Sequence, residues 1–172
     1  MIGILIVSHG AFGESLIHSA SHVLGKRPMY LRQLGVTVHD DPDAVLPMAR
    51  DLIRFLDQGR GVLVLTDIYG ATPSNIAARI LQPGRVEGIA GVNLPMLIRA
   101  LTYRDEPLEA VIAKALSGGQ DGLTRMPHRT PLSRRTSPSP TSSGSTRAPR
   151  PSSPRRPRST RAPCSSRGTA GA

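Results

Sequence analysis

Two side chains suited to covalent chemistry, His9 and Asp67, stand at the ends of two apolar, β-branched runs of the sequence. A neutral imidazole can act as a nucleophile through one ring nitrogen. It does so best when a carboxylate binds the proton of the other nitrogen, because the carboxylate fixes the tautomer and stabilises positive charge developing on the ring. If the fold brings the two residues together, we expect His9 to be the nucleophile and Asp67 its partner.

The residues that follow each of these two suit a phosphoryl group. Thr72-Pro73 predicts a helix start, with Thr72 as N-cap and Pro73 as the first helical residue. The first turn of a helix presents free backbone N–H groups and the positive end of the helix dipole, which favour a phosphoryl group. The Thr72 hydroxyl either caps this helix or binds the phosphoryl group. We predict Gly10, Thr72 and Ser74 as phosphate-binding residues, with Gly10 allowing close approach of the backbone.

The elements that must position these residues alternate between strands and helices. Apolar, β-branched runs predict four buried strands, at residues 2–7, 29–36, 61–66 and 86–92. Apolar residues at helical spacing predict helices at residues 16–24, 45–56, 72–81, 94–101 and 108–116. Gly118-Gly119 is predicted to end the last helix, and residues 123–126 are a candidate for one more short strand.

This order of elements predicts an α/β fold. Its doubly wound, mainly parallel four-stranded sheet has helices on both faces. Ligands of such sheets bind beyond the carboxyl ends of the strands. If the strands at 2–7 and 61–66 are neighbours, His9 and Asp67 face one crevice at that edge.

Charge divides the chain into two parts. The formal net charge is +10, but residues 1–130 hold 13 basic and 12 acidic residues, whereas residues 131–172 hold 9 Arg and no acidic residue. A segment rich in Arg, Pro and Ser, with few large apolar side chains, cannot offset its ordering entropy. We predict a folded domain at residues 1–127 and a disordered Arg/Pro/Ser-rich tail at residues 128–172, and we expect no nucleic-acid binding by the near-neutral domain.

The tail admits three interpretations. Its Arg residues could bind phosphates of a nucleic acid or an anionic membrane, although it has no aromatic residue for base stacking. Its composition is also what GC-rich codons give when read out of frame, so it could be a frameshift product. The third interpretation is a Pro-rich linker.

Several classes of protein are excluded by what the sequence lacks. The single cysteine, Cys164, excludes an intrachain disulfide and a cysteine-based zinc site. No apolar run approaches the roughly 20 residues of a membrane span, and the first strand follows Met1 without a signal peptide. His18 and His22 have helical metal-ligand spacing but no third ligand, and no nucleotide-binding motif occurs. We expect a cytoplasmic protein with no metal, no cofactor and no membrane insertion.

Three ordered segments resemble the mannose/fructose-type EIIA domain of the bacterial phosphoenolpyruvate:sugar phosphotransferase system (PTS). They are ILIVSHG at 4–10, DIYGATPSN at 67–75 and GVNLPML at 91–97, and the resemblance covers roughly residues 1–127. It implies that His9 takes a phosphoryl group from phospho-HPr, on Nε2, and passes it to a histidine or cysteine of a IIB domain or subunit. It also implies that Asp67 hydrogen-bonds His9 and that Thr72 stands where relatives often carry Ser.

The same resemblance extends to assembly and to one further residue. It implies a homodimer that exchanges a C-terminal strand, at residues 123–126, and a phosphotransferase that needs no metal. Asn93 is explained as a helix cap, but in family terms it lines the same crevice, so it is a weaker site candidate.

Two alternative functions use the same histidine. One is the phosphotransfer subunit of a dihydroxyacetone kinase, which acts with a kinase partner. The other is a PTS-linked regulatory module whose phosphorylated state controls a partner without sugar transport. Gene neighbours would separate the first from a sugar PTS.

Overall fold

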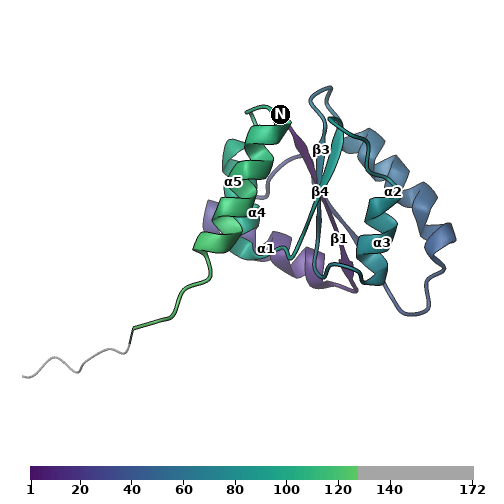
Figure 1. Ribbon diagram of the computed structural model, residues 1–172, viewed down its shortest axis with the longest axis horizontal. Helices are drawn as coiled ribbons and strands as arrows, with labels where there is room; N and C mark the ends of the chain where they lie inside the picture. Colours follow the sequence, from purple (N-terminus) through teal and green to yellow (C-terminus); the bar gives the residue numbers. More distant parts are fainter. Residues whose placement is uncertain (128–172) are drawn as a thin grey trace, which may run out of the picture. The chain divides into compact units, whose positions relative to one another are not determined.

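A parallel sheet forms the centre of the protein, as the alternation of strands and helices predicts. The computed structural model describes residues 1–127, and its four strands lie in the order β2-β1-β3-β4 (Figure 1). They are β1 (Gly3–His9), β2 (Leu31–Val36), β3 (Val62–Thr66) and β4 (Val86–Ala90). All three pairings are parallel, which confirms the predicted α/β fold. The predicted tail at 128–172 lies outside the described residues.

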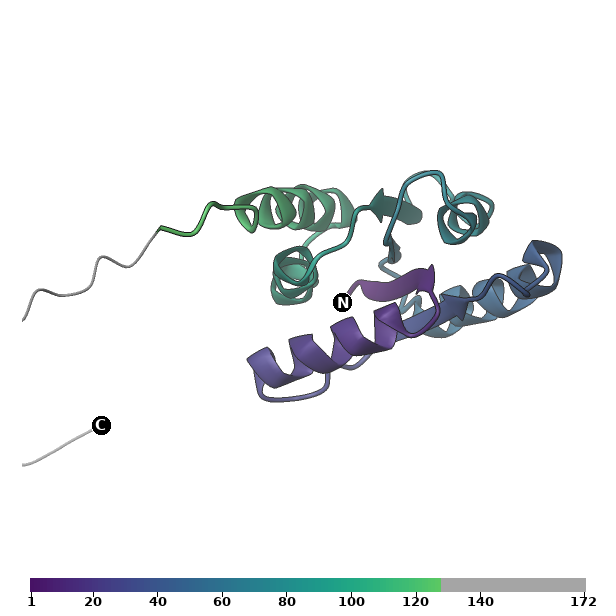
Figure 2. The same cartoon turned by 90° about the horizontal axis from the view of Figure 1, so that it is seen from below.

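Helices cover both faces of the sheet (Figures 1 and 2). One face packs against α1 (Phe12–Leu24), α4 (Leu94–Tyr103) and α5 (Leu108–Asp121), and the other packs against α2 (Pro42–Leu56) and α3 (Thr72–Ala78). Between residues 1 and 127, no helix is both long enough and apolar enough to span a bilayer.

The central strand explains why its sequence is continuously apolar. β1 pairs with β2 on one side and β3 on the other, and all its residues except the last are buried. Ile4 and Ile6 pack in the layer of α1, α4 and α5, whereas Leu5 and Val7 pack in the layer of α2 and α3. A strand covered on both faces needs apolar residues at every position.

The pairing of β1 with β3 decides where the polar loops lie. Val7 is the register partner of Thr66, so the two strands end side by side. Because both strands run in the same direction, the loops that carry His9 and Asp67 emerge at the same edge of the sheet. The condition set by the sequence pattern for a shared crevice is therefore met.

The predicted end of the last helix at Gly118-Gly119 is wrong, because α5 continues to Asp121. Both glycines are buried against α4, and an added Cβ at Gly118 would lie 2.7 Å from the Arg99 Cβ atom. At Gly119 an added Cβ would lie 2.7 Å from Met96 Cε. The pair of glycines thus allows two helices to approach closely, which local sequence cannot distinguish from a stop signal.

The candidate strand at residues 123–126 does not form within the described part of the chain. These residues have no regular secondary structure and lead away from the sheet in both views (Figures 1 and 2). Leu123 and Met126 are 80% and 84% exposed. A strand needs a hydrogen-bonding neighbour, and residues 1–127 of one chain offer none at this position.

Candidate functional site

His9 and Asp67 meet where β1 and β3 end. The ring Nδ1 of His9 lies 2.8 Å from Oδ2 of Asp67, and the backbone N–H of His9 donates to the same oxygen at 2.8 Å. The other oxygen, Oδ1, accepts from the backbone N–H of Ile68 at 2.8 Å. The carboxylate is therefore held in place by two loops, and it holds both the backbone and the ring of the histidine.

Burial and charge divide the roles of the two side chains. The Asp67 side chain is 11% exposed, whereas the His9 side chain is 48% exposed, so the ring is accessible from solvent. Burial raises the pKa of Asp67, but the hydrogen bonds from His9 and Ile68 and the nearby imidazole outweigh it and hold that pKa below its ordinary value. Asp67 is therefore ionised at neutral pH.

The ionised carboxylate determines which ring nitrogen can react. A carboxylate can only accept hydrogen bonds, so Nδ1 of His9 carries the proton in their 2.8 Å contact. In the neutral ring the lone pair is then on Nε2. The arrangement can support nucleophilic attack by Nε2, with the positive charge that develops on the ring stabilised by Asp67.

Ser8, the residue before His9, anchors the turn after β1. Its side chain is fully buried, and its Oγ accepts from the backbone N–H of Gly13 at 2.9 Å, in the first turn of α1. Gly10 has φ +48°, and its N–H donates to the carbonyl of Val36 at 2.9 Å. The sequence carries no signal for this role, because it depends on the burial of the hydroxyl in the folded protein.

Close packing fixes the same turn from the side of β2. An added Cβ at Gly35 would lie 2.2 Å from the carbonyl oxygen of Gly10. Residue 35 must therefore be a glycine for the turn after β1 to pack against β2. The backbone around His9 is thus held by Ser8, Gly35 and Val36 as well as by Asp67.

The loop after β3 differs from the prediction by one residue. The N-cap of α3 is Ala71, not Thr72, and no side chain caps this helix. The first helical hydrogen bond runs from the N–H of Asn75 to the carbonyl of Ala71 at 2.9 Å, which makes Thr72 the first helical residue. Pro73 is tolerated one position later because the N–H groups of the first turn have no partner within the helix.

The hydroxyls of Thr72 and Ser74 have different surroundings. Thr72 does not spend its hydroxyl on a cap, so the alternative role remains open to it. Ser74 Oγ accepts a long hydrogen bond of 3.4 Å from the N–H of Gly70, and the Asn75 amide donates to the Gly70 carbonyl at 3.3 Å. These bonds fold the loop back on the start of α3.

Both polar atoms of the Asn93 side chain form a hydrogen bond within the protein. Its Oδ1 accepts from the N–H of Met96 at 2.9 Å and caps α4 as predicted, and its Nδ2 donates to the carbonyl of Gly119 at 3.1 Å. The amide therefore ties α4 to α5, and one of the two N–H groups on Nδ2 makes this contact. Among residues 1–127, no three His, Cys, Asp or Glu side chains gather in a way that could hold a metal ion.

By structure, the protein is an α/β protein whose parallel sheet carries a histidine–aspartate pair at the carboxyl ends of its strands. By sequence, residues 3–116 match the family described as "PTS system fructose IIA component" (EIIA-man). The chain belongs to this family, which is the family that the three ordered segments resemble.

Relatives and solved structures agree with this assignment. The chain is 30% identical over 153 residues to the mannose-specific EIIAB component of Escherichia coli K12, covering 87% of this chain and 46% of that protein. It is 29% identical over 106 residues to the fructose-specific EIIA component of Bacillus subtilis 168, covering 61% of this chain and 72% of that protein. The chain thus spans less than half the length of the first relative.

The fold recurs in solved structures. The mannose/sorbose-specific IIA subunit of Enterococcus faecalis matches with a TM-score of 0.67 and 22% identity over 75% of this chain and 97% of that one. The PTS IIA protein associated with the fucose utilization operon of Streptococcus pneumoniae matches with a TM-score of 0.61 and 28% identity over 72% and 91%.

Proposed function

We propose that the chain is a histidine phosphocarrier: His9 accepts a phosphoryl group from phospho-HPr and passes it to a IIB domain or subunit of a sugar PTS. The observation that carries this proposal is the pairing of a half-exposed imidazole with a nearly buried carboxylate, at 2.8 Å through Nδ1. Such a pair leaves Nε2 as the basic, accessible nitrogen. It needs no metal to make that nitrogen nucleophilic.

The transfer is an in-line exchange between two imidazoles. The lone pair of His9 Nε2 attacks phosphorus, the nitrogen–phosphorus bond of the donor histidine breaks, and the donor ring keeps that electron pair. His9 retains the proton on Nδ1, so the phosphorylated ring carries positive charge beside Asp67. In the second transfer Nε2 is the leaving group, and the histidine or cysteine of IIB is the nucleophile.

The phosphoryl oxygens need donors, and we assign these to Thr72 and Ser74. The Thr72 hydroxyl is not used as a cap. The Ser74 hydroxyl accepts from Gly70 and can still donate its own proton. Gly10 gives its N–H to Val36, so its role is to leave room for the phosphoryl group rather than to bind it.

The loops around His9 support an exchange between proteins. Segments 9–11, 37–41, 67–71 and 91–93 leave the carboxyl ends of the four strands and contain no Lys or Arg. A site without cations holds the phosphoryl group through neutral donors, which favours onward transfer over storage. Phe12, Ile68 and Tyr69 are 43%, 60% and 88% exposed near these ends and offer apolar contact to a partner protein.

The assembly that we propose is a homodimer with an exchanged C-terminal strand. β4 is an edge strand of the sheet, and within residues 1–127 its outer side is paired only at Val86, by a bridge to Gln82. Leu123 and Met126 are exposed on the segment that follows α5. Pairing of that segment with a second copy would cover both features.

The domain boundaries and location follow from the same function. We assign residues 1–127 to the EIIA domain, which contains the whole family match at 3–116.

The alignment with the E. coli EIIAB component spans 153 residues, more than the 127 described residues, which supports a linker rather than a frameshift product at 128–172. Because the proposed function requires contact with HPr and IIB, we assign the protein to the cytoplasm. The dihydroxyacetone kinase and the purely regulatory alternatives have no observation in their favour.

The experiment that tests this function is phosphorylation in solution. With phosphoenolpyruvate, enzyme I and HPr, the protein is expected to gain one acid-labile phosphoryl group, measured by intact mass. His9→Ala should gain none, because it lacks the nucleophile. His22→Ala removes an exposed histidine from α1 and should label as the wild type does. Labelling of His9→Ala at the wild-type level would disprove the assignment.

A further inference from the structure

Two buried hydroxyl-bearing residues, Ser8 and Thr66, directly precede the two site residues. Ser8 is 0% exposed and Thr66 is 4% exposed, and they are followed by His9 and Asp67. Ser8 has its partner in Gly13, but Thr66 Oγ1 has no hydrogen-bond partner among the described residues. A buried hydroxyl without a partner costs stability, so native proteins satisfy such groups with protein atoms or ordered water.

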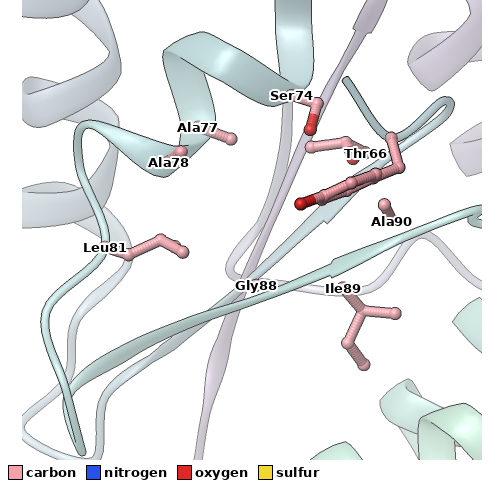
Figure 3. Close-up of a pocket in the computed structure, with 9 residues that line it drawn as sticks. Thr66, Ser74, Ala77, Ala78, Leu81, Gly88, Ile89 and Ala90 are labelled. Carbon is pink, nitrogen blue, oxygen red and sulfur yellow. The ribbon is translucent and has the colours of Figure 1, made fainter. Parts of the chain in front are cut away.

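Thr66 lines a hollow between α3 and β4 (Figure 3). Its neighbours along β3, Val62 and Val64, pack in the layer of α2 and α3, so the alternation of the strand directs Thr66 to the same side. Ser74 on the first turn of α3 also lines the hollow, and Figure 3 shows its hydroxyl oxygen pointing into it. Tyr69 is the third hydroxyl-bearing residue of the lining.

The size and chemistry of the hollow determine what can occupy it. Its volume is about 110 Å³. A water needs roughly 10–15 Å³ measured this way, whereas sites for drug-sized ligands begin at roughly 300 Å³. The rest of the lining is Ala, Leu, Ile and Gly, and no charged side chain contributes. A small species that forms hydrogen bonds, such as water, fits this lining.

We propose that ordered water bound in this hollow bridges Thr66 Oγ1 to the hydroxyl of Ser74. The bridge joins the end of β3 to the first turn of α3, which are the two ends of the loop that begins at Asp67. Thr66 is then a positioning residue: through water and Ser74 it holds the loop whose carboxylate orients His9.

Exchange of Thr66 for Val tests the bridge, because the two side chains have the same shape and differ in the hydroxyl. If water satisfies the hydroxyl, Thr66→Val loses about one hydrogen bond, and Tm is expected to fall by roughly 3–5 °C. Thr66→Ser keeps the hydroxyl and should retain most of the coupling to Ser74. A rise in Tm of Thr66→Val would show an unsatisfied hydroxyl and would overturn the proposal.

Val64→Thr is the matched control for this exchange. Val64 lies two residues earlier, on the same face of β3, and is fully buried in an apolar cluster. Its added hydroxyl has no hollow beside it, so Tm should fall. If Thr66→Val raises Tm by as much as Val64→Thr lowers it, then position 66 is as dry as position 64.

Two further measurements distinguish a water bridge from ordinary packing. In the Thr66→Val/Ser74→Ala double variant the losses in Tm should be smaller than the sum of the single losses, because either change alone breaks the bridge. A nuclear Overhauser effect between long-lived water and the Thr66 methyl group is expected in the wild type. Additive losses, or no such effect, would each contradict the proposal.

The positioning role has its own readout in the tautomer of His9. Nitrogen-15 NMR should show the Nδ1–H tautomer in the wild type and in Thr66→Ser. In Thr66→Val a smaller share of this tautomer is expected, because the Asp67 loop is less firmly held. An unchanged tautomer in a destabilised Thr66→Val would restrict Thr66 to a structural role and overturn the positioning claim.

Discussion

At the scale of single residues, one carboxylate determines the state of the histidine. Oδ2 of Asp67 receives both the ring and the backbone N–H of His9, so it sets the orientation of the ring and its tautomer together. Asp57 offers a comparison within the same chain, because its Oδ1 accepts from the N–H groups of Gly59 and Gly61. Its side chain is 9% exposed, close to the 11% of Asp67, but it contacts no histidine.

Asp67→Asn is expected to slow phosphorylation of His9 by roughly 10- to 100-fold, the equivalent of one hydrogen bond to a charged group. The amide keeps the shape but does not stabilise positive charge on the ring. The rate is measured by rapid quench with phospho-HPr. Asp57→Asn, the matched control, should lower stability and leave the rate unchanged. Equal rates for Asp67→Asn and the wild type would show that Asp67 does not act on His9.

Asp67 also makes stability depend on pH. The pKa of Asp67 in the folded protein lies below the ordinary value. Burial raises this pKa, but the hydrogen bonds from His9 and Ile68 lower it by more. Its contribution is therefore complete above the unfolded pKa of about 4, and it is lost as pH falls through the folded pKa. We expect the difference in Tm between the wild type and Asp67→Asn to be constant near neutrality and to shrink below about pH 4. A difference that grows on acidification would contradict this sign.

At the scale of elements, the contact between α4 and α5 depends on missing side chains. An added Cβ at Gly118 would lie 2.7 Å from Arg99 Cβ and 3.2 Å from the Pro95 carbonyl oxygen, so neither neighbour can simply rotate away. Two helices that approach this closely separate when either one gains volume.

Gly118→Ala is expected to destabilise the domain by about 1–2 kcal/mol, because overpacking outweighs the better helix propensity of Ala. Denaturant unfolding followed by circular dichroism measures the change. Gln120→Ala, on the exposed side of the same helix, should leave stability within about 0.5 kcal/mol of the wild type. An increase in stability for Gly118→Ala would show that α4 and α5 can accommodate a methyl group at this position.

Elements were predictable where local pattern decides the outcome. The apolar runs gave β1 to β4 within a few residues because strands buried on both faces admit little else, and Asn93 caps α4 as its sequence indicates. The His9–Asp67 contact required only that β1 and β3 pair. The role of the α5 glycines was not predictable, because they pack against residues of α4. The start of α3 was predicted one residue late, because Thr is a favoured N-cap residue and Ala is not. The burial of the Ser8 and Thr66 hydroxyls is set by packing on the sheet, which the local sequence does not show.

At the scale of the whole molecule, the segment after α5 does not pack against the rest of the described chain. Leu123 and Met126 are exposed, and within the described residues the outer side of β4 is paired only at Val86. If a second copy covers both, association and folding of this segment are coupled.

Light scattering coupled to size-exclusion chromatography is expected to give a molar mass twice that of the 18.3 kDa chain. The double variant Leu123→Asp/Met126→Asp should be a monomer, since charged side chains oppose burial of the segment. Val23→Asp changes a side chain that is 58% exposed on α1, so it should remain dimeric. A wild-type monomer at micromolar concentration would exclude the exchanged-strand dimer.

The hold of Asp67 on His9 has a kinetic consequence. Because one oxygen fixes both the backbone and Nδ1 of the histidine, the ring offers a single reactive nitrogen in a single direction. In the proposed function, the donor and the acceptor must reach that nitrogen along the same line, so they cannot be bound at the same time. The two half-reactions then alternate, and steady-state kinetics should give the parallel double-reciprocal lines of a ping-pong mechanism.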